Sequence, residues 1–119
     1  MIKGYMEKIQ NLIDQVDECL SKCEYIYRNL NKPCIPKDIS DIYKKAIPKV
    51  IERLYENKGN LKIDLRTCRK ILVEQRTVNN DLINLIKNNN NALKQDEKKY
   101  SELLEVLIFI ETAIKNNDK

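Results

Sequence analysis

The four cysteines are the residues whose type and spacing could do chemistry. Cys19 and Cys23 are four residues apart, so on one face of a helix their thiolates could share a zinc ion, with Cys34 and Cys68 completing a tetrahedral set. The chain has no CxxC-type turn, however, and Cys19, Cys23 and Cys68 fall at apolar positions of helical patterns, where a free cysteine behaves as a small buried hydrophobe. The sequence therefore favours core thiols, and we expect no metal and no cofactor.

Other catalytic chemistry has few candidate residues. The chain contains no His, which removes the most common general base and the usual partner of a nucleophilic Ser or Cys. With only two glycines, Gly4 and Gly59, it cannot form a glycine-rich phosphate loop. We therefore expect that the protein is not an enzyme.

The elements that would position any site begin with a long amphipathic helix. Apolar residues occupy three positions of every seven from residue 2, which is typical of a helix packed into a bundle. Pro33 and Pro36 disfavour helical geometry in the residues before them, so we expect this helix over residues 2–31. The three rows are Ile2, Ile9, Val16, Cys23 and Leu30; Tyr5, Leu12, Cys19 and Ile26; and Met6, Ile13, Leu20 and Tyr27.

A shorter helix is expected over residues 39–57. Pro48 lies inside its apolar pattern and removes one helical hydrogen bond, which predicts a kink or a break. Gly59 suits the left-handed residue that closes a helix. The apolar stripe consists of Ile39, Ile42, Tyr43, Ala46, Ile47, Val50, Ile51 and Leu54.

From Leu61 onwards, heptad rows continue without a break to Ile114 and leave two architectures open. Residues 61–116 could form one helix of roughly 80 Å. Alternatively, Asn88 to Asn91 could form a turn between helices over 61–88 and 92–117, because Asn tolerates the left-handed conformation and is a poor helix former. We favour the turn.

These elements predict one all-α domain over residues 1–119, an antiparallel helical bundle with coiled-coil-like packing. It would consist of three long helices and the shorter, Pro-kinked one. The net charge of +4 is modest, and its densest basic segment, residues 62–70, is explained by a solvated helix face. The first residues do not form a secretory signal, no apolar run is long enough to span a membrane, and the cysteines are expected to be reduced, so we expect a cytoplasmic or nuclear protein.

One apolar stretch exceeds what a single core can take. Val106 to Ile110 are five apolar residues in a row, and at about 100° per residue they surround the helix. Ile108 and Phe109 then face away from their own bundle, on the side of Thr112. Either the Pro-kinked helix or another chain covers them, because such a pair is normally covered. Our candidate partner-binding residues are Val106, Ile108, Phe109 and Thr112.

These observations predict a non-enzymatic helical module for protein–protein interaction, a subunit or adaptor that assembles an intracellular complex. Its partner would be another protein or a second copy of itself, bound through the last helix. The alternative is a small helical nucleic-acid-binding or regulatory protein that uses the basic segment 62–70.

Overall fold

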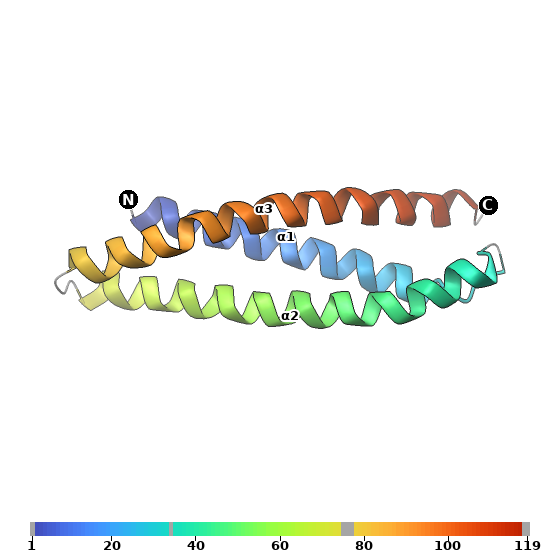
Figure 1. The fold of residues 1–119 in the computed structure, drawn as a ribbon, viewed down its shortest axis with the longest axis horizontal. Coiled ribbons are helices and arrows are strands. Elements are labelled where there is room, and N and C mark those ends of the chain that lie inside the picture. Colours follow the sequence, from blue (N-terminus) through green and yellow to red (C-terminus); the bar gives the residue numbers. More distant parts are fainter. Residues whose placement is uncertain (1, 34, 75–77, 118–119) are drawn as a thin grey trace.

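The chain folds into three long α-helices. The computed structural model describes residues 2–33, 35–74 and 78–117, with side chains at 3–33, 35–70, 84 and 90–116. The helices are α1 (Ile2–Arg28), α2 (Lys37–Glu74) and α3 (Val78–Asn117). They run up, down and up in a rod of 60 × 21 × 21 Å, so α1 and α3 are parallel to each other and antiparallel to α2 (Figure 1).

The core lies along α1, which packs against both other helices, whereas α2 and α3 contact each other at few places. All three apolar rows predicted for α1 contribute buried side chains. By contrast, α2 and α3 each bury mainly one row of spacing seven. The buried apolar residues are Tyr5, Ile9, Leu12, Ile13, Val16, Cys19, Leu20, Cys23, Ile26 and Leu30, then Ile47, Leu54, Leu61, Leu65 and Cys68, and finally Leu93, Tyr100, Leu107 and Ile114.

The connection between α1 and α2 is held by local hydrogen bonds. Past Arg28 the backbone forms tight turns, in which the Asn29 N–H donates to the Ile26 carbonyl at 3.1 Å. Ser40, in the first turn of α2, is buried, and its hydroxyl donates to the Leu30 carbonyl at 2.7 Å. This hydrogen bond holds the first turn of α2 against the segment that directly follows α1. The first helix was predicted over residues 2–31, and the observed helix ends three residues earlier, at Arg28.

The prediction of a separate helix over 39–57 is wrong, because α2 continues through Pro48 and Gly59 to Glu74. Pro48 and Lys44 are both exposed, so water can donate to the Lys44 carbonyl that Pro48 leaves without a helical partner. Across Gly59, the buried row continues from Leu54 to Leu61 in register. Its burial offsets the cost of about 1 kcal/mol for a helical glycine.

The predicted turn at Asn88 to Asn91 is also wrong, since these residues lie inside α3. The alternative of one helix over residues 61–116 does not hold either, because α2 ends at Glu74 and α3 begins at Val78. The preserved heptad register was the better guide to the Asn run. It places Leu93 and Tyr100 on α1, and their burial opposes the cost of the asparagines.

Candidate interaction surface

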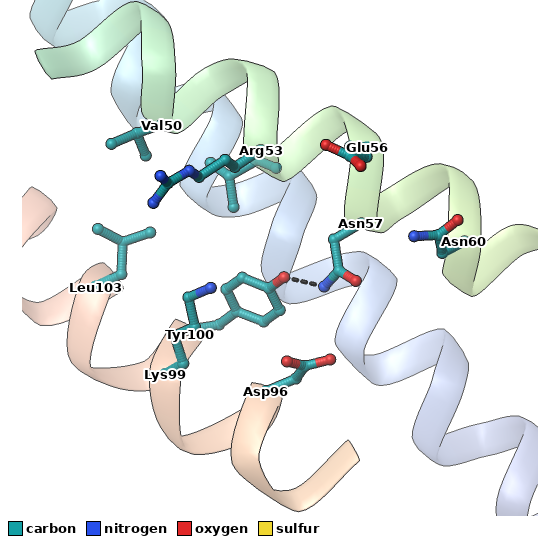
Figure 2. Close-up of a pocket in the computed structure, with 10 residues that line it drawn as sticks. Val50, Arg53, Glu56, Asn57, Asn60, Asp96, Lys99, Tyr100 and Leu103 are labelled. Atoms are coloured by element: carbon teal, nitrogen blue, oxygen red, sulfur yellow. Dashed lines mark hydrogen bonds between the residues drawn. The ribbon is translucent and has the colours of Figure 1, made fainter. Parts of the chain in front are cut away.

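A groove separates α2 and α3, because both helices pack on α1 and contact each other little. In its central part the groove deepens into a cleft of about 410 Å³ (Figure 2). We refer to the whole channel as the α2–α3 groove. The cleft is lined by Val50, Arg53, Leu54, Glu56, Asn57 and Asn60 from α2, and by Asp96, Lys99, Tyr100 and Leu103 from α3.

Tyr100 and Asn57 bridge the two helices at the cleft. The side-chain amide of Asn57 donates to the Tyr100 hydroxyl, as Figure 2 shows. Tyr100 is buried, and its backbone carbonyl accepts a weak hydrogen bond from the Cys19 thiol of α1 at 3.8 Å. Burial raises the pKa of the Tyr100 hydroxyl. The phenol therefore stays protonated at neutral pH, and its role is to fix α3 on α1 and α2.

The charges of the cleft are separated along its length. Figure 2 shows the guanidinium of Arg53 and the ammonium of Lys99 reaching into the space between the helices, near Leu103. Glu56 and Asp96 lie further along the cleft, beside the Asn57–Tyr100 bridge. Within the part of the chain whose side chains are described, no carboxylate forms an ion pair with either Arg53 or Lys99. Both cations are therefore available to an incoming anionic group.

Towards the C-terminal end of α3 the groove becomes apolar. A hollow of about 220 Å³ lies between the start of α2 and the last turns of α3. Phe109 stands at this hollow with 75% of its surface exposed. The lining residues are Leu30, Ile35, Pro36, Ile39, Tyr43, Phe109, Ile110, Ala113 and Ile114.

The four predicted partner-binding residues are all exposed, but they do not form one patch. Val106 (55% exposed) and Phe109 are about 60° apart around α3, on the side that faces the groove. Ile108 (43% exposed) projects about 100° away from Phe109 towards the opposite flank, and Thr112 lies between the two directions. Although the start of α2 lies beside Phe109, it leaves most of that side chain uncovered. The structure thus brings Val106 and Phe109 to the groove and leaves Ile108 outside it.

Sequence reasoning missed the α2 side of this surface. Ile39 and Ile42 were assigned to the core stripe of the second helix, yet they are 43% and 64% exposed. Ile42 lies at the edge of that stripe and Ile39 in the first turn of α2, and a pattern of residue types does not distinguish these positions from buried ones. Arg53 and Lys99 carried no signal, since charged residues are spread over the whole sequence.

The cysteines lie in the core, apart from Cys34, which is outside the described residues. Cys19, Cys23 and Cys68 are free and fully buried. Burial raises the pKa of both the Cys19 and the Cys23 thiol to about 11, so these thiols are protonated and unreactive at neutral pH. Among the described residues, no group of three or more His, Cys, Asp or Glu side chains could hold a metal ion.

The basic segment 62–70 lies on the flank where α2 faces α1. Lys62, Arg66 and Arg69 border a shallow hollow of about 260 Å³ together with Gln10 and Ile13. One turn before the segment, Lys58 forms an ion pair with Asp17 of α1 at 2.5 Å. The three cations therefore share one side of the bundle and are accessible from solvent.

Comparison of the chain with protein-family models, with curated proteins and with solved structures finds no match. Within the described residues, none of the helices combines the length and the apolar character that crossing a membrane requires. The surface itself is therefore the feature from which a function can be inferred.

Proposed function

We propose that this chain is a non-enzymatic protein-interaction module, a subunit or adaptor whose α2–α3 groove binds an amphipathic helix of a second chain. The observation that carries the proposal is Phe109, a large aromatic residue three-quarters exposed beside an apolar hollow. Apolar surface rimmed by polar side chains is typical of a docking site, and helix-in-groove binding uses anchors spaced three or four residues apart. Covering Phe109 would remove roughly 150 Å² from water, worth about 3 kcal/mol before ordering costs.

The charge pattern supports the same mode of binding. A helix that lies along the groove would pass from the apolar hollow to the unpaired cations Arg53 and Lys99. An acidic side chain placed about three turns beyond the apolar anchors would meet them. Cys19, Cys23 and Cys68 are free thiols, as is typical of a reducing compartment, and we propose that this role is performed in the cytoplasm or nucleus.

A selection from a display library of helical peptides tests the proposal. We expect the recovered peptides to carry apolar residues at helical spacing and an acidic residue to one side, with affinity measured by fluorescence anisotropy. Phe109→Lys should weaken binding at least about tenfold, equivalent to about 1.4 kcal/mol. The matched control Ile108→Lys, on the other flank of α3, should change it less than about twofold. If no helical peptide is recovered, or if both substitutions act equally, the proposal is wrong.

The second candidate function, nucleic-acid binding, is favoured by one observation, the gathering of Lys62, Arg66 and Arg69 around a single hollow. Three phosphate contacts would give a slope of roughly −3 for log K against log salt on duplex DNA. Binding with that slope, lost in Arg66→Glu with Arg69→Glu, would favour this function. Salt-tolerant peptide binding in the groove would favour the first.

A further inference from the structure

Resting on the proposed docking role of the α2–α3 groove, we propose that the helix it binds is α3 of a second copy of this chain. The two copies would be related by a two-fold axis parallel to the helices, so that each α3 lies in the other copy's groove. Two rows of exposed residues flank the groove, one on α2 and one on α3.

The first row lies on α3 and consists of Lys98, Glu102, Glu105 and Phe109, which we call the outer row of α3. At about 100° per residue, these four positions fall within an arc of roughly 60°. All four side chains are exposed. Read from its C-terminal end, the row is apolar, then acidic at two positions, then basic.

The second row lies on α2 and consists of Ile42, Lys49, Arg53 and Glu56, which we call the outer row of α2. These positions also fall within an arc of about 60°, and all four side chains are exposed. Read from its N-terminal end, the row is apolar, then basic at two positions, then acidic. Because α2 and α3 are antiparallel (Figure 1), the two rows run side by side in opposite chain directions. Their first positions are both apolar, and the next three carry opposite charges.

Contacts across the groove fix which residues of the two helices lie level. Asn57 is level with Tyr100 through their hydrogen bond, and Tyr43 lines the same hollow as Ile110. Interpolation between these two residue pairs places Arg53 about level with Glu102 along the helix axes. By the same interpolation, Lys49 is level with Glu105 and Phe109 with the stretch from Ile42 to Ala46, while Glu56 is level with Ser101, less than one helical turn from Lys98.

A two-fold axis parallel to the helices keeps every residue of the second copy at its own level. The outer row of the partner's α3 would therefore meet the outer row of α2 with two level pairs of opposite charge, a third pair offset by less than one helical turn, and one apolar contact. These six charged side chains form no ion pair within 4.0 Å in the described part of the single chain. They are consequently free to pair with a second copy.

A perpendicular two-fold axis fails the same comparison. If the perpendicular axis crosses α3 at Phe109, the two Phe109 rings meet. Glu102 of one copy then falls level with residue 116 of the other. On α2 that level corresponds to Asp38, which has the same charge as Glu102. The charges along the groove therefore favour the parallel arrangement over a perpendicular axis through Phe109.

The contact is large enough for a stable dimer. Residues 98–116 of α3 span about 27 Å, and half the surface of a helix about 10 Å across is then roughly 420 Å². Each copy buries one such face of α3 and its own groove, and the two areas partly overlap. The buried area is therefore on the order of 600–800 Å² per copy. A standard stable interface buries about 800 Å² per partner.

A charge exchange between two variants tests the inference in the full chain. We expect light scattering of the wild type to show a mass of twice 14.1 kDa at micromolar concentration. In the homodimer, Glu102→Arg places a cation against Arg53 of the other copy, and Arg53→Glu places a carboxylate against Glu102 of the other copy. Each variant alone should therefore dissociate at least about tenfold more readily. When the two are mixed, both substituted positions meet their opposite charge, and the affinity should return to within about threefold of the wild type. Glu7→Arg, exposed on α1 and away from the groove, is the matched control and should remain dimeric.

Three outcomes would overturn the inference: a monomeric wild type up to about 100 μM, single variants that remain dimeric, or a mixture that does not recover. Circular dichroism of each variant shows whether it is folded, and two folded single variants that recover on mixing exclude misfolding as the cause of dissociation. A monomer that still binds selected helical peptides through Phe109 would leave the proposed function intact and make the second copy the wrong partner. A monomer that binds no helix would overturn both.

Discussion

Large apolar side chains occur both on α1 and along the α2–α3 groove, but they are buried on α1 and exposed along the groove. On α1, Ile9, Val16 and Ile26 are completely buried, because α2 and α3 cover that helix from two sides. Across the groove, Ile42 and Phe109 remain mostly exposed. Apolar character alone therefore does not decide burial. The number of helices that can reach a given face does.

The width of the apolar pattern on each helix explains the difference. Since α1 has three apolar positions in every seven, it can bury side chains against two neighbours. On α2 and α3, one row of spacing seven packs against α1. Of the described apolar residues outside that row, Ile42, Val106 and Phe109 remain exposed. Polar contacts follow the same geometry, since Lys58–Asp17 and Lys22–Glu111 both join α1 to another helix.

The largest expected effect on the free energy of unfolding comes from comparing a buried residue of α1 with an exposed residue of the α2–α3 groove. Ile26→Ala should lower the free energy of unfolding by about 2–5 kcal/mol, because it leaves a cavity in a fully packed site. Ile42→Ala should change it by less than about 0.5 kcal/mol in the monomer, because that side chain is 64% exposed. Urea unfolding at submicromolar concentration measures both. Equal losses would show that the groove is as tightly packed as α1 and would break the comparison.

The sequence predicted α1 best, for the same reason that α1 is the most buried helix. Three apolar rows on one helix predict that it packs into a core. The structure confirms the all-helical class and the packing of the helices against one another. The helix ends were predicted worst. Gly59 and the four asparagines are locally unfavourable in a helix, but the buried rows that pass through them outweigh those local costs.

Half of the candidate surface could be found from the sequence. Phe109 and Val106 stand in an apolar run too long for one core, and this excess is visible without a structure. The α2 side could not be found, because the exposure of Ile39 and Ile42 depends on how far apart α2 and α3 lie. That separation is a property of the packing on α1 and not of any local pattern.

An intermediate effect is expected where the two regions meet. Ser40→Ala removes the hydroxyl that donates to the Leu30 carbonyl at 2.7 Å and leaves a buried acceptor unpaired. We expect a loss of about 1–3 kcal/mol in the free energy of unfolding. The loosened junction should also open the apolar hollow beside it, so an environment-sensitive dye should bind more strongly at equal fold. Ser40→Thr, which keeps the donor, is the control. A loss equal to that of Ser40→Ala would assign the effect to packing.

The smallest expected effect is electrostatic and concerns Glu111, which joins α1 to α3. Its carboxylate accepts hydrogen bonds from Lys115 at 2.9 Å and from Lys22 at 3.3 Å, and these bonds lower its pKa. A lowered pKa in the folded state stabilises the fold above the unfolded value of about 4.3, and the contribution is lost as the pH falls through the folded pKa. Glu111→Gln should therefore cost less than about 1 kcal/mol at pH 7, because Lys115 is exposed and screened by solvent.

The pH dependence separates this ion pair from simple packing. At about pH 2 the wild type and Glu111→Gln should have equal stability, since the carboxyl is then protonated in both the folded and unfolded states. Urea unfolding between pH 2 and pH 7 measures the difference, with the exposed Glu7→Gln on α1 as the control. A difference that persists at pH 2, or that exceeds about 2 kcal/mol at pH 7, would mean that Glu111 acts through its shape. The contact of Glu111 with α1 would then be part of the packing between α1 and α3 rather than a charge pair.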